Sequence, residues 1–148
     1  MTVYIASDHA GFDMKAAIKA YLVEKGIDIE DVGPNNQTSV DYPDYGAALA
    51  GSMKGKESAV GIAICGSGIG ISIAVNRYPW MRAALVTDMT GARLCREHND
   101  ANVLALGERL VGIQIALDCV DAFLATPFEG GRHQRRVIKL SRPDDLLP

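Results

Sequence analysis

A cysteine stands where a short apolar run meets a glycine-rich loop. Residues 58–76 read SAVGIAICGSGIGISIAVN, and the run Val60–Ile64 is typical of a buried parallel strand. Cys65 follows it, and after the glycines an apolar, helix-compatible segment extends to Asn76. A strand, a glycine loop and a helix in this order form a cradle of backbone amides for an anion. In that cradle the helix dipole and the amides favour the thiolate, which is both a nucleophile and a base.

Spacing disfavours three familiar sites that use such a loop. A P-loop needs a Gly-Lys pair followed by Ser or Thr, and a dinucleotide site needs G-x-G-x-x-G, whereas here the glycines are Gly66, Gly68 and Gly70. A cysteine-dependent phosphatase needs an arginine in the turn, and residues 66–72 contain no basic side chain. A nucleotide site stays open, because Asp88 follows a later predicted strand where a ribose-binding acid would stand. A structural turn around a small buried cysteine stays open too.

The groups that remain suit the isomerisation of an aldose to a ketose. This reaction needs a base that moves a proton between C1 and C2, and hydrogen-bond donors for the enediolate that forms. Cys65 is the candidate base, and the loop amides are the candidate donors, with the Ser67 hydroxyl beside them. The imidazole of a histidine titrates near neutral pH and suits the opening of a sugar ring, and arginines suit a phosphate at the far end of the sugar.

Apolar runs alternate with helical patterns along the whole chain, which predicts one doubly wound (Rossmann-like) α/β domain over residues 1–148. Its five-stranded parallel sheet has helices on both faces. Strands are predicted at 1–6, 27–32, 58–64, 82–87 and 102–106, and helices at 12–25, 44–53, 69–76, 88–99, 112–124 and 132–142, with a C-terminal helix and tail from about residue 130. Asp8-His9, Cys65 with its glycines, and Thr87-Asp88 all follow strands, so we expect them to converge on one crevice.

Composition excludes several other classes of protein. A net charge of -3 gives no reason to expect a nucleic-acid partner. No apolar run approaches the roughly 20 residues that span a bilayer, and no signal-peptide pattern opens the chain, so we expect a cytoplasmic protein without a membrane partner. The cysteines number three and lack CxxC spacing, which argues against a disulfide framework or a zinc site.

Five ordered motifs together resemble the ribose-5-phosphate isomerase B family, which also includes the subunits of galactose-6-phosphate isomerase. They are Asp8-His9-Ala10-Gly11-Phe12, Asp41-Tyr42-Pro43, Cys65-Gly66-Ser67-Gly68-Ile69-Gly70, His98-Asn99-Asp100-Ala101-Asn102 and Gly130-Gly131-Arg132-His133-Gln134. The resemblance extends from the first strand to about Val137. It implies an aldose–ketose isomerase that interconverts D-ribose 5-phosphate and D-ribulose 5-phosphate, a step of the pentose phosphate pathway.

The resemblance also implies a role for each matching residue. Cys65 matches the catalytic base, and His98 matches the acid–base group that opens the sugar ring. The loop whose amides stabilise the enediolate corresponds to Gly66, Ser67, Gly68, Ile69 and Gly70. Substrate-binding positions correspond to Asp8, His9 and Asn99, and basic positions for substrate or phosphate to Arg109, Arg132 and Arg136. The family needs no metal or cofactor and forms homodimers or homotetramers with active sites at a subunit interface.

Two departures from the family pattern matter. Ser67 stands where many members have threonine, and it keeps the hydroxyl that relays a proton. Some members place a carboxylate base on the following helix, whereas this chain has Val75 there and no acid from Gly66 to Asn76, which leaves Cys65 as the base.

Several assignments have a structural alternative. Asp8 is also placed to cap the helix that begins near Phe12, and Tyr42 either packs the long loop or forms a wall of the site. His98 is, without the family, a surface or capping residue. Arg132 and Arg136 are four apart, so on a helix they share a face and could grip one phosphate; His133 lies off that face and receives no role.

The substrate also has alternatives. A phosphorylated aldose of four or six carbons, or a free rare sugar, would fit the same motifs. From another class of protein, a non-catalytic nucleotide-binding module would use the same glycine loop without needing the thiol.

Overall fold

Five short apolar runs form one parallel sheet. The computed structural model describes residues 2–148 and orders the strands as β2 (Asp28–Gly33), β1 (Thr2–Ser7), β3 (Val60–Cys65), β5 (Val103–Gly107) and β4 (Ala83–Leu85). Every neighbouring pair is parallel. The central strands β1, β3 and β5 are buried almost throughout, whereas β2, at one edge, is half-exposed. The predicted fold class is therefore confirmed.

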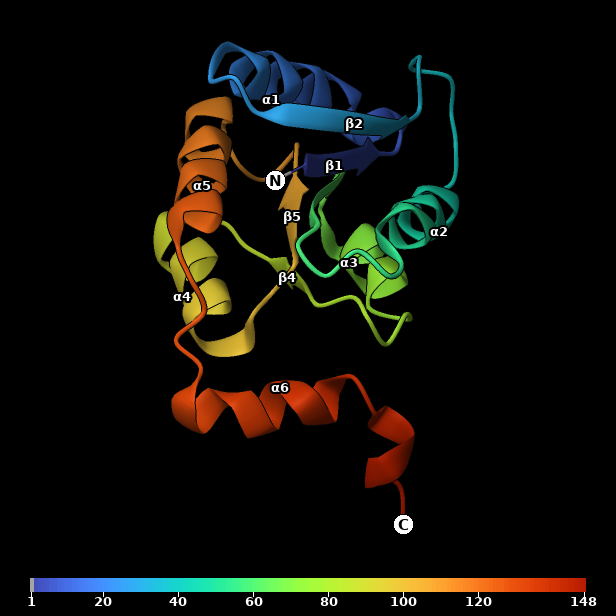
Figure 1. Cartoon of the computed structure of the whole chain (residues 1–148). Helices are drawn as coiled ribbons and strands as arrows, with labels where there is room; N and C mark the ends of the chain where they lie inside the picture. The colour runs from blue at the N-terminus through green and yellow to red at the C-terminus, as the bar shows by residue number, and fades with distance from the viewer. Residues whose placement is uncertain (1) are drawn as a thin grey trace.

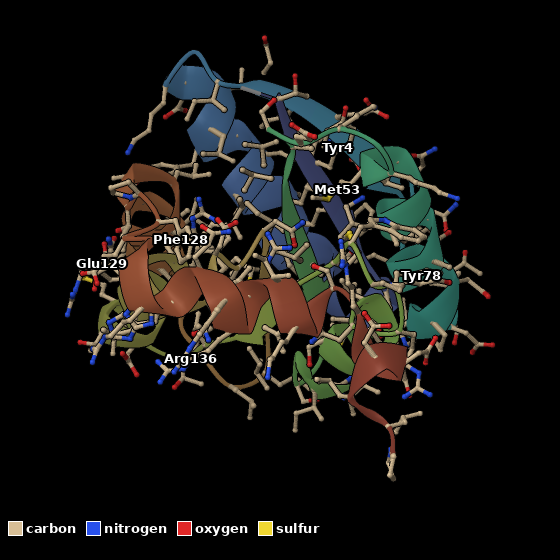
Figure 2. The ribbon with its side chains drawn as sticks, turned by 60° about the horizontal axis from the view of Figure 1, so that its bottom comes forward. Tyr4, Met53, Tyr78, Phe128, Glu129 and Arg136 are labelled. Carbon is tan, nitrogen blue, oxygen red and sulfur yellow. The ribbon has the colours of Figure 1, made fainter. Side chains whose placement is uncertain are left out.

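Helices cover both faces of this sheet (Figure 1). The side chains of Val3 and Ile5 pack with those of α1 (Phe12–Glu24), α4 (Met89–Asn99) and α5 (Ile113–Ala125). On the other face, Tyr4 and Ala6 pack with α2 (Tyr42–Met53) and α3 (Ile69–Val75). Figure 2 shows Tyr4 and Met53 in this second layer, close to α2. The alternation along β1 thus divides the core into two layers, as a strand with period two requires.

The connection between strands reverses direction beside β1. The chain leaves β1 through α1 to reach β2 on one side, and β3 then pairs with β1 on the other side. In a doubly wound sheet, this switch point leaves a crevice at the carboxyl ends of the two strands. Ser7 pairs with Ile64 at this end, and Cys65 follows immediately.

The edge strand β4 is shorter than the predicted 82–87. The amide of Arg82 donates to the side chain of Asn102 (2.7 Å), and that of Ala83 donates to the side chain of Asn76 (2.8 Å). Side-chain amides therefore replace strand partners at its start, and after Leu85 the chain turns toward α4.

The C-terminal segment contains a shorter helix than predicted. A 3-10 turn, Gly131–His133, precedes α6 (Gln134–Leu140), and a second 3-10 turn, Pro143–Leu146, follows it. A third such turn, His9–Gly11, follows β1. Figure 1 shows α6 beyond the end of α4, across the bottom of the view. No helix between residues 2 and 148 combines the length and the apolar character needed to cross a membrane.

Candidate active site

A cavity of about 370 Å³ lies at the switch point between β1 and β3. Eight of the predicted site residues line it, drawn from four separate parts of the chain. They are Asp8, His9, Tyr42, Cys65, Gly66, Ser67, Gly70 and Arg109. The expected convergence of the segments after β1 and β3 at this edge of the sheet is thus present.

The thiol of Cys65 meets a backbone donor at the end of its strand. The side chain is buried, and the amide of Gly68 donates to its sulfur at 3.1 Å. Gly68 has φ +74°, and a Cβ there would lie 2.9 Å from the carbonyl oxygen of Leu106, so only glycine fits. This hydrogen bond fixes the sulfur at the carboxyl end of β3, where it faces the cavity.

The loop amides divide into occupied and free donors. The amide of Gly68 binds the sulfur, and that of Ile69 donates to Oγ of Ser67 at 3.2 Å. The amides of Ser67 and Gly70 donate to no protein acceptor among residues 2–148. Ser67 and Gly70 both line the cavity, so these two amides of the predicted loop are free to donate to an acceptor there. The Ile69 side chain is half-exposed and does not line the cavity.

Backbone hydrogen bonds fix the loop between the neighbouring strand ends. The amide of Asp8 donates to the carbonyl of Ile64 (3.1 Å), and that of Glu108 donates to the carbonyl of Cys65 (3.0 Å). A Cβ on Gly107 would lie 2.5 Å from the carbonyl carbon of Ser67, so β5 approaches the loop too closely for any side chain at this position.

The remaining lining residues surround the thiol. Asp8 is buried, and its Oδ1 accepts from the amides of Ala10 (2.9 Å) and Gly11, so it caps the turn after β1 as well as facing the cavity. Nδ1 of His9 lies 3.2 Å from both the nitrogen and the oxygen of Val40.

Two longer side chains complete this wall. A Cβ on Gly70 would lie 2.7 Å from the ring of Tyr42, which places that ring directly against the loop. A Cβ on Gly66 would likewise lie 3.3 Å from the guanidinium of Arg109. The cavity therefore has a hydroxyl-bearing ring and a cationic side chain on either side of the glycine loop.

Three other predicted site residues belong to a different cavity. His98, Asn99 and Arg136 line a space of about 380 Å³ that has no lining residue in common with the first. The reason is topological, since α4 begins at the carboxyl edge of the sheet and runs back, so that His98 lies at the amino edge. Arg132 is exposed in the 3-10 turn before α6 and does not continue the helical face of Arg136, contrary to the prediction.

Two arginines hold the end of α4 that carries His98. Asp100 follows α4 with φ 46° and ψ 43°, a left-handed conformation that is uncommon for residues other than glycine. Its carboxylate accepts from Arg82 (3.0 Å) and from Arg96 (3.1 Å) on separate oxygens. These ion pairs secure the turn immediately after Asn99.

Comparison with known proteins decides the family. The family model described as Ribose/Galactose Isomerase matches residues 3–140. The chain belongs to the ribose/galactose isomerase family. Over 130 residues it is 47% identical to ribose-5-phosphate isomerase B of Escherichia coli K12, which covers 88% of this chain and 87% of that protein.

Solved structures of the family agree with the fold. The enzyme from Clostridium thermocellum, a ribose-5-phosphate isomerase B, superposes with a TM-score of 0.94 and 48% identity over 98% of both chains. The enzyme from Mycoplasma genitalium, solved with bound ribulose 5-phosphate, has a TM-score of 0.93 and 40% identity over 99% of this chain and 97% of that one. The resemblance inferred from the motifs is therefore confirmed, and this chain is an isomerase.

One acidic residue of this isomerase was wrongly expected in the crevice. Asp88 caps α4, because its Oδ1 accepts from the amide of Gly91 at 2.8 Å, and it does not line the cavity around Cys65. Since β4 ends at Leu85, three residues earlier, its end does not bring this carboxylate to the switch point. Asp88, the candidate acid for binding a nucleotide ribose, therefore caps a helix instead.

Sequence reasoning assigned no role to His133, yet its ring touches His98. The two imidazoles are stacked, with centroids 4.5 Å apart and planes inclined by 13°. His133 is buried, and this burial is the main reason that its pKa is lower than the ordinary value. The charges of His98, Arg132 and Arg136 lower the pKa of His133 further, whereas the carboxylate of Glu129 raises it. A helical-face argument could not find this contact, because it joins a turn to the end of another helix.

The same region contains a group of three side chains that could in principle bind a metal ion. Ligand-type atoms of His98, Glu129 and His133 lie within 4.8 Å of one another in the described residues. A metal ion bound by imidazole lies in the plane of each ring, and two stacked planes 13° apart cannot share one ion without turning a ring. This geometry does not suit a metal.

Proposed function

We propose that this chain interconverts D-ribose 5-phosphate and D-ribulose 5-phosphate through an enediolate, with side chains transferring the protons and backbone amides donating hydrogen bonds to the enediolate oxygen. The observation that carries the proposal is the Cys65 sulfur in the switch-point cavity, with the Gly68 amide donating to it. The Mycoplasma genitalium relative solved with ribulose 5-phosphate supports the choice of a five-carbon sugar.

In the proposed mechanism, the thiolate of Cys65 removes the proton from C2 of the open-chain aldose. The C–H electron pair forms a C1–C2 double bond, and the carbonyl oxygen becomes the enediolate oxygen. The free amides of Ser67 and Gly70 then donate to that oxygen, in the manner of an oxyanion hole. Return of the proton to C1, with the Ser67 hydroxyl relaying a proton between O1 and O2, gives the ketose.

His98 is proposed to open the ring of the aldose by protonating the ring oxygen as the bond from this oxygen to C1 breaks, while the anomeric hydroxyl loses its proton to solvent and C1 becomes the carbonyl carbon. Ribose 5-phosphate is mostly cyclic, whereas ribulose 5-phosphate has its C5 oxygen esterified and forms no ring. Removal of His98 should therefore lower kcat with the aldose far more than kcat with the ketose. Asn99 beside it is proposed to hold a sugar hydroxyl.

Phosphate binding is proposed for Arg132 and Arg136 at the far end of the sugar, with Asp8, His9, Tyr42 and Arg109 around the chain of carbons. Within one chain, Asp8, His9, Tyr42 and Arg109 line one cavity and Arg136 lines the other, whereas Arg132 lines neither of the two. We therefore propose a homodimer, alone or within a tetramer, in which the Cys65 cavity of one subunit faces the His98 cavity of the other.

A panel of phosphorylated aldoses with four, five and six carbons tests the proposal. Fastest isomerisation of ribose 5-phosphate is expected, with formation of the ketose measured directly. A preference for a six-carbon aldose phosphate would move the enzyme toward the galactose branch of its family. Binding of a mononucleotide with no isomerisation of any sugar would contradict the proposal.

A further inference from the structure

We propose that His133 is a positioning residue for ring opening, because its imidazole ring is stacked on the ring of His98 and holds it in place. The proposal rests on the proposed role of His98 as the group that protonates the ring oxygen. His133 itself transfers no proton and acts only through the ring stacked on it.

The stack is the contact that orients His98. Centroids 4.5 Å apart and planes only 13° from parallel place one ring flat on the other. No hydrogen bond from residues 2–148 reaches the His98 ring, although its backbone is fixed at the end of α4. The χ2 torsion of histidine is broad and roughly two-fold, so a ring without a hydrogen bond has no preferred plane of its own. A flat neighbour restricts that torsion and so directs the ring nitrogens.

His133 is held more firmly than the ring it supports. It is 7% exposed, it belongs to the 3-10 turn that precedes α6, and its amide donates to the carbonyl of Gly130 at 3.0 Å. Figure 2 shows Glu129 and Arg136 near the N-terminal half of α6, on either side of this turn in the sequence. A buried ring in a hydrogen-bonded turn is a suitable support for the ring of His98.

Direct binding of substrate by His133 fits the structure less well. Its Nε2 is buried from solvent and has no hydrogen-bond partner among residues 2–148, and the carboxylate of Glu129 lies 3.7 Å away, beyond hydrogen-bond distance. His133 lines the same cavity as His98, but this nitrogen is buried and does not face a sugar there. Burial also lowers the pKa of the His133 ring, which favours its neutral form beside His98.

Two substitutions separate the flat ring from its nitrogens. His133→Phe keeps a planar ring, and His133→Ala removes it. The chain has three histidines, so the imidazole proton resonances of His98 and His9 can be followed by NMR without crowding. Stacking predicts a ring-current shift of the His98 resonances in the wild type and in His133→Phe, and its loss in His133→Ala. The resonances of His9, which lies in the other cavity, should not change and serve as the internal control.

Kinetics in both directions then test the role. His133→Ala should lower kcat with ribose 5-phosphate about tenfold, while kcat with ribulose 5-phosphate and KM for both sugars stay within about twofold of wild type. His133→Phe should have most of the wild-type kcat with ribose 5-phosphate. Three results would each overturn the role of His133. They are a His98 resonance without a ring-current shift in the wild type, an equal loss of kcat with both sugars in His133→Ala, and a His133→Phe variant as slow as His133→Ala. A wild-type enzyme that leaves ribose 5-phosphate unchanged would instead overturn the proposed function, while the NMR result would still decide whether the stack exists.

Discussion

Within one chain, Cys65 and His98 lie at opposite ends of the parallel strands, Cys65 at the carboxyl ends and His98 at the amino ends. Cys65 is the last residue of β3, and His98 lies in the last turn of α4, which has run back to the amino edge. A six-residue strand extends over roughly 17 Å, several times the distance between the ring oxygen and C2 of one sugar. Under the proposed mechanism both side chains act on one substrate molecule, so each complete site combines Cys65 of one subunit with His98 of another.

Mixing two inactive variants tests this arrangement. Cys65→Ala and His98→Asn should each be nearly inactive toward ribose 5-phosphate. After unfolding and refolding together in equal amounts, half of the dimers contain one chain of each kind and regain one complete site out of two. We expect about a quarter of the wild-type rate.

The control is each variant refolded alone, which should stay inactive. If the refolded mixture contains mixed dimers, shown by mass spectrometry, and yet has no more activity than its components, then both groups come from one chain and the two-subunit site is wrong.

The three thiols should differ sharply in reactivity. Burial raises the pKa of Cys95 to about 11 and that of Cys119 to about 11, so neither forms a thiolate near neutral pH. Cys65 faces a cavity and accepts a hydrogen bond from Gly68. Iodoacetamide at pH 7.5 should therefore modify Cys65 alone, and ribose 5-phosphate should slow the reaction. Peptide mapping that finds Cys95 or Cys119 labelled first would contradict this assignment.

Much of the fold follows from sequence because its signals are local. The run Val60–Ile64 and the glycines after Cys65 specify a buried strand and a tight loop wherever the rest of the chain lies, and both are present. The same holds for the alternation of strands and helices that predicted a parallel sheet. Which strand ends meet follows from parallel topology, and the segments after β1 and β3 do meet.

The sequence predictions failed at two local features, a helix cap and a turn, and missed one contact between distant segments. Asp88 was expected in the crevice, but the local cap of α4 uses its carboxylate. Arg132 and Arg136 were expected on one helical face, but Gly130 and Gly131, both with positive φ, start a 3-10 turn that keeps Arg132 out of α6. The stack between His98 and His133 joins segments 35 residues apart with no spacing signal. The roles of the site residues themselves stay predictions.

A buried ion pair should make the protein sensitive to acid. The buried ammonium of Lys15 bonds to Asp31 at 2.7 Å, and Lys19 pairs with the other carboxylate oxygen. Desolvation would raise the pKa of Asp31, but the bonds from the two lysines and from the Gly33 amide outweigh it, and the pKa is lowered below its ordinary value. The ionised carboxylate thus stabilises the fold at pH values above its unfolded pKa, and this stability is lost as pH falls through the folded pKa.

Asp31→Asn should therefore lower the free energy of unfolding at pH 7 by roughly 3 kcal/mol, since it leaves a buried ammonium without its counter-charge. Urea unfolding between pH 7 and pH 2 should show a shallower loss of stability for the variant than for the wild type. Asp28→Asn, at the exposed start of the same strand, is the matched control. Parallel curves for wild type and Asp31→Asn would show that the pair does not contribute.

Arg136 should affect substrate affinity more than chemistry. It lines the cavity of His98, and a phosphate is remote from the carbon atoms that exchange protons. Arg136→Ala should therefore raise KM for ribose 5-phosphate about tenfold or more with a smaller change in kcat. Arg135→Ala, the exposed neighbour that lines no such cavity, is the matched control and should leave both constants near wild type. An unchanged KM for Arg136→Ala would place the phosphate elsewhere.

The turnover of Cys65→Ala tests the central claim most directly. Cys65 is the base in the proposed mechanism, and no acid between Gly66 and Asn76 can replace it. The variant, with a melting temperature close to that of wild type, should lose about 10³-fold in kcat in both directions and should no longer incorporate solvent deuterium into either sugar. Turnover within tenfold of wild type in the folded variant would contradict the assignment of Cys65 as the base.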